Sequence, residues 1–157
     1  MVIIPAQKED LQNILHLQYL AYQSEARLFQ NHEIPPLKQT LADLELDYQM
    51  GIILKATDDE NRIIGSVRAQ TRDGTVYVGK LIVDPSMQGK GIGTMLLRRI
   101  EQEYPNKRYE LFTSTQSHRN IALYERLGYR VFGEKQITDE LKFVYFEKFG
   151  AVEQPVE

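Results

Sequence analysis

The sequence predicts a single-domain α+β fold with one mixed, mostly antiparallel sheet that is flanked by helices. The length of 157 residues is that of one domain. Strand-like runs in the first half of the chain indicate an antiparallel meander, and helical and strand-like patterns then alternate to its end. We expect the domain to span residues 1–150 and a frayed tail to follow over residues 151–157.

The composition is that of an ordinary soluble globular protein, with 42% hydrophobic and 26% charged residues. A net charge of −3 argues against a general nucleic-acid binder, and no apolar run is long enough to span a membrane. The chain has no cysteine, which excludes disulfides, thiolate metal sites and a cysteine nucleophile. We therefore expect a cytoplasmic protein that needs no metal, nucleic acid or membrane.

The first part of the chain is expected to contain an edge strand and two helices. Residues 2–4 are a short apolar run ended by Pro5. Apolar side chains at three- and four-residue spacing then predict a helix over residues 7–28 and a second one over residues 37–48. The Ile34-Pro35-Pro36-Leu37 segment is expected to break the helical pattern between them.

The remaining elements alternate between strands and helices. The meander strands are expected at residues 52–54, 63–67 and 76–83, and Asp73-Gly74 is the stronger hairpin signal between them. The later elements are, in order, a helix over 92–100, a strand over 108–113, a helix over 121–127 with Gly128 as its C-cap, and strands over 129–132 and 141–146.

A glycine-rich turn, Gln88-Gly89-Lys90-Gly91-Ile92-Gly93, joins the last meander strand to the next helix. Glycine allows a positive φ and close approach of a ligand, and successive N–H groups before a helix bind phosphate oxygens. Lys90 adds a positive charge, so the turn is a candidate site for a pyrophosphate-sized anion. It matches neither the P-loop nor the G-x-G-x-x-G spacing. A turn that only reverses the chain is the alternative.

Two segments resemble the signature motifs of the GNAT acetyltransferases. Residues 81–97 read LIVDPSMQGKGIGTMLL, a hydrophobic strand and an Asp-Pro step followed by Gln-x-x-Gly-x-Gly at Gln88, Gly91 and Gly93. Residues 120–129 read NIALYERLGY, with a tyrosine followed by Gly-Tyr. The motifs occur in the family's order, about thirty residues apart, which is more specific than either one alone. The resemblance covers roughly residues 50–147 and implies a bulged, splayed central strand.

The resemblance also implies acetyl-CoA as co-substrate, with no metal. The main chain of Leu81, Ile82 and Val83 would hold the pantetheine arm and the thioester carbonyl. An N–H group aimed at that carbonyl contributes about 3 kcal/mol in comparable sites. Asp84-Pro85 would shape the turn. The pyrophosphate would be held by Gln88, Gly89, Lys90, Gly91, Ile92, Gly93 and Thr94.

Tyr124 matches the family's tyrosine near the coenzyme sulfur. A phenol, with a reference pKa of about 10, is a candidate acid or hydrogen-bond donor for a thiolate, whose reference pKa is about 8.5. The alternative is an aromatic side chain that only packs. Many relatives carry an asparagine at the position of Ser117. Asn120 is the first candidate to replace it on pantetheine, and either residue could instead cap the helix.

No motif identifies the general base that an amine, with a reference pKa of about 10.4, requires. Glu25 is the first candidate, and Glu33 and His118 follow; each could also be an ordinary surface side chain. Without a cysteine, the acetyl group is expected to pass directly from the thioester to the amine of a small molecule or peptide. The two N-terminal helices and their proline hinge are expected to line the acceptor site.

The acceptor itself stays open at this level. The acidic bias of residues 25–48 favours a cationic amine, although it also fits a solvated helix face. Two other functions compete with the enzyme: a CoA-binding sensor or inactive relative, and a structural domain whose glycines are accidental. A homodimer is also open.

Overall fold

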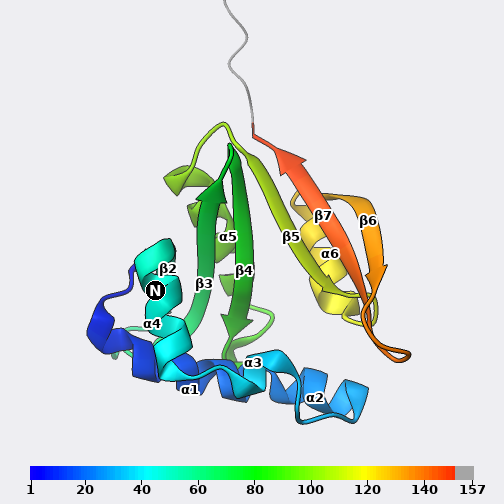
Figure 1. Cartoon of the computed structure of the whole chain (residues 1–157). Coiled ribbons are helices and arrows are strands. Elements are labelled where there is room, and N and C mark those ends of the chain that lie inside the picture. Colours follow the sequence, from blue (N-terminus) through cyan, green and yellow to red (C-terminus); the bar gives the residue numbers. More distant parts are fainter. Residues whose placement is uncertain (151–157) are drawn as a thin grey trace, which may run out of the picture.

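Seven strands form one sheet in the order β1-β2-β3-β4-β5-β7-β6 in the computed structural model, which describes residues 1–150 (Figure 1). The strands are β1 (Val2–Pro5), β2 (Ile52–Thr57), β3 (Ile63–Arg72), β4 (Thr75–Val83), β5 (Arg108–Ser114), β6 (Arg130–Gln136) and β7 (Lys142–Phe149). Neighbouring strands are antiparallel except for the parallel pair of β4 and β5. The predicted mixed sheet is confirmed. The predicted tail, residues 151–157, lies outside the described residues, so the boundary at 150 stays a prediction.

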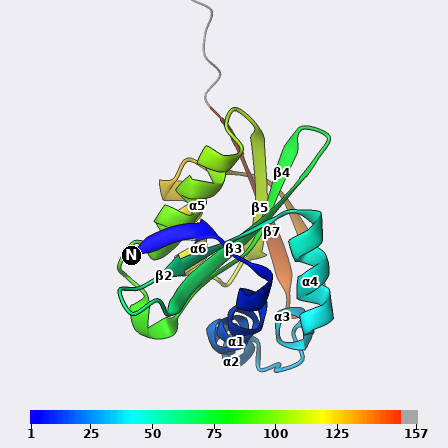
Figure 2. The ribbon, with the colours of Figure 1, turned by 90° about the vertical axis from the view of Figure 1, so that its left-hand side faces the viewer.

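Helices cover both faces of this sheet. They are α1 (Leu11–Ala21), α2 (Gln23–Phe29), α3 (Pro35–Lys38), α4 (Leu41–Met50), α5 (Ile92–Glu103) and α6 (His118–Arg126), with short 3₁₀ turns η1 (Lys8–Asp10) and η2 (Pro85–Met87). Figure 2 shows α5 and α6 on one side of the sheet and α4 on the other. Helices α1, α2 and α3 cross the end of the sheet towards which β4 runs (Figure 1). None of the helices within residues 1–150 combines the length and apolar character that crossing a membrane requires.

The N-terminal helices differ from the prediction in two ways. The single helix expected over residues 7–28 is divided into α1 and α2 at Tyr22. No proline or glycine marks this break in the sequence. The proline hinge, expected only to interrupt helices, starts α3: Ile34 is extended, the conformation favoured before proline, and Pro35 occupies the first helical position.

Several local signals hold as predicted. Arg72 pairs with Thr75, so Asp73-Gly74 is a two-residue hairpin turn with φ values of +51° and +82°. Gly128 follows α6 with a φ of +93°, and its N–H donates to Glu125 O at 3.0 Å.

Two hydrophobic cores lie on opposite faces of the sheet. The larger core, under α5 and α6, includes the fully buried Leu96, Leu97 and Ile100 of α5 together with Val67 and Phe146 of the sheet. The smaller core lies under α1 and α4 and contains Ala6, Leu11, Ile14, Leu15, Leu44 and Ile53. The sheet is therefore held from both sides, as a layered α+β fold requires.

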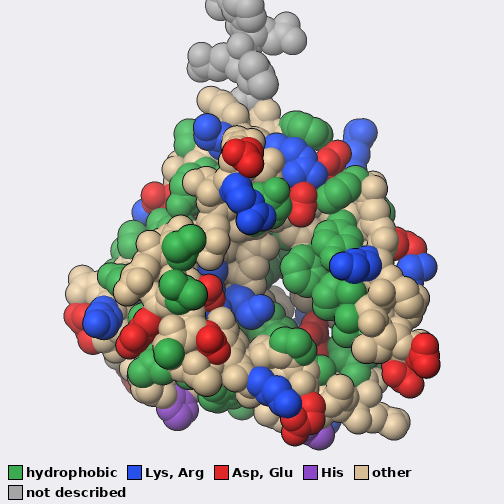
Figure 3. Space-filling model, in the orientation of Figure 1, with side chains coloured by type: hydrophobic (Ala, Val, Ile, Leu, Met, Phe, Trp, Pro, Cys, Tyr) green, Lys and Arg blue, Asp and Glu red, His purple; other side chains and the backbone are tan. Residues whose placement is uncertain are grey.

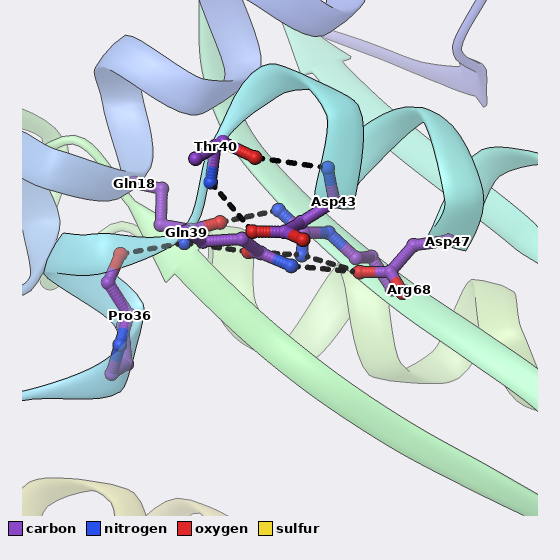
Figure 4. A network of polar contacts seen from close by, with 7 residues as sticks. All are labelled: Gln18, Pro36, Gln39, Thr40, Asp43, Asp47 and Arg68. Carbon is purple, nitrogen blue, oxygen red and sulfur yellow. Dashed lines mark hydrogen bonds and ion pairs between the residues drawn. The ribbon is translucent and has the colours of Figure 1, made fainter.

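A buried polar network fastens the N-terminal helices to the sheet (Figure 4). Gln18 of α1 donates to Pro36 O and to Gln39 Oε1, both at 2.8 Å. Arg68 of β3 donates through Nη1 to Gln39 Oε1 at 2.9 Å and to Asp47 Oδ2 of α4 at 3.1 Å, and through Nη2 to Gln18. One arginine thus joins α1, the α3–α4 connection and α4 to the centre of the sheet.

We expect Arg68→Met to lower the free energy of unfolding by about 3–5 kcal/mol, because it leaves buried partners of the guanidinium unpaired. Arg62→Met is the matched control, since Arg62 also pairs with an aspartate, Asp58, but is exposed. The control should unfold at nearly the wild-type denaturant concentration. Equal losses in the two variants, measured by urea unfolding, would show that the network does not fasten the helices.

Candidate active site

The sheet opens between β4 and β5. These parallel strands pair only where residues 75–77 meet residues 108–110, and they then diverge towards the end occupied by α1, α2 and α3 (Figure 1). β5 remains paired with β7 along its whole length. From Val78 to Val83, the edge of β4 that faces β5 has no strand partner within residues 1–150. The predicted splayed strand is confirmed, and its backbone groups on that side are free for a ligand.

β4 also carries a bulge at Lys80, as the resemblance implied. Its register with β3 shifts between the pairs Ser66–Ile82 and Arg68–Gly79, so β4 has one more residue there than β3. Lys80 takes up the extra length in the left-handed conformation, with a φ of +51°. This conformation is uncommon for a residue other than glycine.

The bulge leaves Lys80 on the face of the sheet opposite to the larger core. Val76 and Val78 before it, and Leu81 and Val83 after it, all belong to that core. Strict alternation would have put the later pair on the other face. Lys80 instead lies within electrostatic range of Arg68, Asp47 and Glu25.

The turn after β4 presents backbone donors to solvent. Asp84 shapes its start by accepting hydrogen bonds from Ser86 N at 2.9 Å and Ser86 Oγ at 2.8 Å. Gly89 and Gly91 have φ values of +79° and +81°. A Cβ added to either glycine would have no other atom within 4 Å, so the cradle opens outwards.

The N–H groups of this turn have no acceptor among the described residues. They belong to Gln88, Gly89, Lys90, Gly91, Ile92, Gly93 and Thr94. Helix α5 begins there, with Gly91 as an N-cap that has no side-chain hydrogen bond. Free donors at the start of a 12-residue helix, beside the exposed Lys90, are the kind of arrangement that can hold a phosphate-sized anion.

Two residues of the turn lie against α6. A Cβ on Gly93 would lie 3.3 Å from Leu123 Cδ2, so glycine at this position allows α5 and α6 to pack closely. Gln88 accepts a hydrogen bond from Arg119 of α6, a residue that the motifs did not single out. Helix α6, which lies on the β5 side of the opening, therefore supports the turn.

Tyr124 of α6 has a buried ring and an accessible hydroxyl. The ring packs edge-on against Phe146, with centroids 5.5 Å apart. The hydroxyl has no hydrogen-bond partner, and Arg68 Nε is the one fully buried side-chain nitrogen or oxygen without a partner in residues 1–150. The hydroxyl must therefore keep contact with solvent. Burial raises its pKa, and the carboxylate of Glu25 adds to the increase.

Glu25 of α2 lies at the opening together with Tyr124. Ser117 Oγ donates to Glu25 Oε1 at 3.1 Å, a contact between residues 92 positions apart in the chain. Burial raises the pKa of Glu25, and the hydrogen bond from Ser117 and the charge of Lys80 oppose that increase. Tyr22, at the break between α1 and α2, is a further neighbour that sequence reasoning missed. Burial and then Glu25 raise its pKa.

The capping alternative for Ser117 and Asn120 is wrong. Ser117 stands at the N-cap of α6, but its side chain makes no capping hydrogen bond because it donates to Glu25. Asn120 lies within the helix and donates through Nδ2 to Thr113 Oγ1 of β5 at 3.3 Å. The two side chains therefore contact α2 and β5 rather than the backbone of the helix end.

The remaining base candidates lie elsewhere. Glu33 is exposed and pairs with Lys38, which lowers the pKa of Glu33 and so weakens it as a base. His118 is exposed in the first turn of α6. Of the three carboxylate and imidazole candidates, Glu25 is the one that contacts another residue of the opening.

Most of the acidic excess in residues 25–48 has structural partners. Asp43 and Thr40 form a capping box at the start of α4. Asp47 binds Arg68, and Glu33 binds Lys38. The argument for a cationic amine from the acidic bias of residues 25–48 is therefore weaker, because only part of this negative charge is free to face a ligand.

The space-filling view shows a hollow in the middle of this face, at the opening between the two halves of the sheet (Figure 3). Basic and acidic side chains lie near its floor, and one wall is largely hydrophobic.

No group of three or more His, Cys, Asp or Glu side chains suited to a metal ion occurs in the part of the chain described.

Comparison with known proteins assigns the family. The sequence model described as acetyltransferase (GNAT) family matches residues 10–129. No curated protein sequence gives a significant match. Among solved structures, the ribosomal-protein-S18-alanine N-acetyltransferase from Escherichia coli superposes with a TM-score of 0.79 at 18% identity, covering 99% of both chains.

Two further structures show the same architecture. A phosphinothricin acetyltransferase from Sinorhizobium meliloti, in complex with acetyl-CoA, gives a TM-score of 0.75 at 19% identity, covering 99% of this chain and 93% of that one. An N-acetyltransferase from Staphylococcus aureus gives 0.74 at 20% identity, covering 94% and 97%. At such identities the likeness shows the fold alone, and the family model, which spans most of the chain, supplies the assignment. The chain belongs to the GNAT acetyltransferase family.

Proposed function

We propose that the protein transfers an acetyl group from acetyl-CoA to an amine of a small molecule or peptide. One observation carries the proposal. The opening between β4 and β5 brings together an unpaired strand edge, a turn of free N–H groups, and the polar groups of Glu25 and Tyr124. The first two features suit a long, extended, phosphate-bearing co-substrate, and the last two suit proton transfer.

The donor would bind through the main chain. Leu81 and Val83 direct their side chains into the core, so these residues and Ile82 offer only backbone groups to the pantetheine arm. Residues 88–94 would hold the pyrophosphate, with Lys90 adding charge. Asn120, whose side chain donates a hydrogen bond to β5, is proposed to contact pantetheine from the β5 side of the opening. Bound acetyl-CoA would supply the thioester whose acetyl group is transferred.

Glu25 is proposed as the general base. Its raised pKa makes it a better proton acceptor than an exposed glutamate. Ser117 fixes one carboxylate oxygen and leaves the other to accept the proton of the amine. The positive charge of Lys80 nearby favours the ionised form of Glu25 and so opposes part of the effect of burial.

Tyr124 is proposed to stabilise the departing thiolate. Because burial and Glu25 raise its pKa, the phenol stays protonated at neutral pH. A thiol, with a reference pKa of about 8.5, is a stronger acid than such a phenol. Tyr124 therefore serves as a hydrogen-bond donor to the sulfur rather than as a source of a fully transferred proton.

A coenzyme A sensor without turnover would need the strand edge and the turn but not the Glu25–Ser117 pair. That pair, beside a tyrosine hydroxyl with no protein partner in residues 1–150, favours the enzyme. Release of the free thiol of CoA in the presence of a panel of amines separates the two. If the protein binds acetyl-CoA but releases no thiol with any amine, the result would support the sensor and reject the enzyme.

In that assay we expect Tyr124→Phe to lower kcat by roughly 10- to 1000-fold while the Kd of acetyl-CoA stays unchanged. Tyr129→Phe is the matched control, because Tyr129 is also buried but bonds through its hydroxyl to Glu101 at 3.3 Å, away from the opening. Wild-type kcat in Tyr124→Phe, with chemistry limiting the rate, would mean that the residue only packs.

Glu25→Gln should make the protein slower but more stable at neutral pH. A carboxyl group with a raised folded-state pKa contributes stability that is complete below its unfolded pKa of about 4.3 and is lost as pH rises through the folded value. The variant should therefore exceed wild type in free energy of unfolding at pH 7, and the gain should vanish near pH 4. We expect kcat/KM at pH 7 to fall about 100-fold or more.

Glu33→Gln provides the control of opposite sign. The pKa of Glu33 is lowered by Lys38, so its carboxylate stabilises the fold above the unfolded pKa and loses that effect as pH falls. Substitution there should not stabilise the protein at pH 7 and should leave kcat/KM unaffected. If Glu25→Gln shows wild-type kinetics at every pH, Glu25 is not the general base and another residue must accept the proton.

A further inference from the structure

We propose that Lys80 binds an anionic group of the acceptor, so that the acceptor carries a carboxylate as well as the amine that is acetylated. The inference rests on the proposed function and names the substrate class of the same site. It replaces the cationic acceptor that the acidic composition of residues 25–48 suggested.

Position is the first argument. The bulge turns Lys80 away from the larger core and towards the side of the sheet that carries Arg68, Asp47 and Glu25. Glu25 in turn holds Ser117 at the start of α6. Lys80 therefore lies at the opening, on the same side of β4 as the proposed base.

The second argument is that the charge of Lys80 lacks a partner. Among residues 1–150, its ammonium group takes part in no ion pair within 4.0 Å and in no hydrogen bond. The side chain is half-buried, yet its Nζ is not among the fully buried atoms without a partner, so it keeps contact with solvent. Burial lowers the pKa of Lys80 and the neighbouring Arg68 lowers it further, while the carboxylates of Asp47 and Glu25 only partly oppose this decrease. An anion from a ligand would relieve this cost.

Each of the nearby carboxylates already has one oxygen engaged. Asp47 accepts hydrogen bonds from both Arg68 and Gln39, at 3.1 Å and 3.0 Å. Glu25 accepts from Ser117 and must face the amine if it is the base. An acceptor that has only an amine would pair with Glu25 and leave Lys80 without a partner. An acceptor with an amine and a carboxylate would pair with both Glu25 and Lys80.

Backbone strain is the third argument. A left-handed lysine is less favourable than glycine at the same position, by about 1 kcal/mol or more. Four other non-glycine residues within residues 1–150, Gln30, Asn61, Asp73 and Asn106, also have a positive φ, but Lys80 is the one that lies within a strand, where such strain points to a task in binding or catalysis. Because Gly79 stands directly before Lys80, the chain has a glycine at the bulge and still places the left-handed conformation on the lysine.

The test measures binding to protein saturated with CoA, so that no turnover is needed. Calorimetric titrations would use glycine, β-alanine and γ-aminobutyrate, each beside its primary amide, which keeps the amine and removes the negative charge. For the spacing that fits, the acid should bind wild type about 10-fold or more tightly than the amide, as expected for a charged hydrogen bond. An amidated peptide with an N-terminal aspartate presents the same two groups from a polypeptide. Tighter binding of that peptide would assign the acceptor to peptides.

Lys80→Met should abolish the preference for the acid and leave the affinity for the amide unchanged, and Lys80→Arg should retain much of the preference. Lys135→Met, at an exposed lysine of β6, is the matched control and should behave as wild type. Melting temperatures would confirm that each variant is folded. The inference is overturned if wild type shows no acid preference at any spacing, or if the preference survives in Lys80→Met.

Thiol release with the same amines separates this inference from the proposed function. Binding that depends on Lys80, without turnover of any amine, would reject the acetyltransferase and keep the anion site. Turnover without any preference for the acids would keep the enzyme and reject the role of Lys80.

Discussion

β4 pairs with β5 over only three residues, and the rest of the structure depends on where that pairing stops. A strand in the middle of a sheet normally satisfies its backbone groups on both sides. Here the C-terminal half of β4 keeps β3 on one side and leaves the other side open. The glycine-rich turn follows this open edge, and Glu25 is the base candidate that contacts another residue of the opening.

The opening persists because each half of the sheet is fastened separately. On one side, Arg68 joins α1, α4 and the α3–α4 connection to β3. On the other side, the ring of Tyr124 packs against Phe146 and holds α6 on β7. Gly93 lets α5 approach α6 behind the opening, so the two halves meet there through side chains rather than through strand pairing. Partly buried Glu25 and Lys80, together with the left-handed backbone of Lys80, lie at the site, where function can account for their cost.

The elements and the turn could be predicted because their signals are local. Periodicity located the strands and most helices, Asp73-Gly74 located the hairpin, and the spacing of Gly89, Gly91 and Gly93 located the turn that is proposed to bind phosphate. The break at Tyr22 could not be predicted, since no residue there opposes a helix. Glu25 was identified from its position in the chain, but its contact with Ser117 links residues 92 positions apart. The roles of Lys80 and Arg68 depend on a bulge and a buried network, which only the tertiary structure reveals.

The central claim is that main-chain groups left unpaired at the end of β4 bind acetyl-CoA. Two glycines, one directly before β4 and one in the turn that joins β4 to α5, allow a matched test. Gly91 and Gly74 have φ values of +81° and +82°, and a Cβ on either would meet no atom within 4 Å. Alanine therefore strains the backbone equally at both positions, but only at residue 91 would the methyl group stand where the phosphates approach. Calorimetric titration with acetyl-CoA should give a Kd raised about 10-fold or more in Gly91→Ala and a wild-type Kd in Gly74→Ala. Wild-type affinity in a folded Gly91→Ala variant would contradict the account.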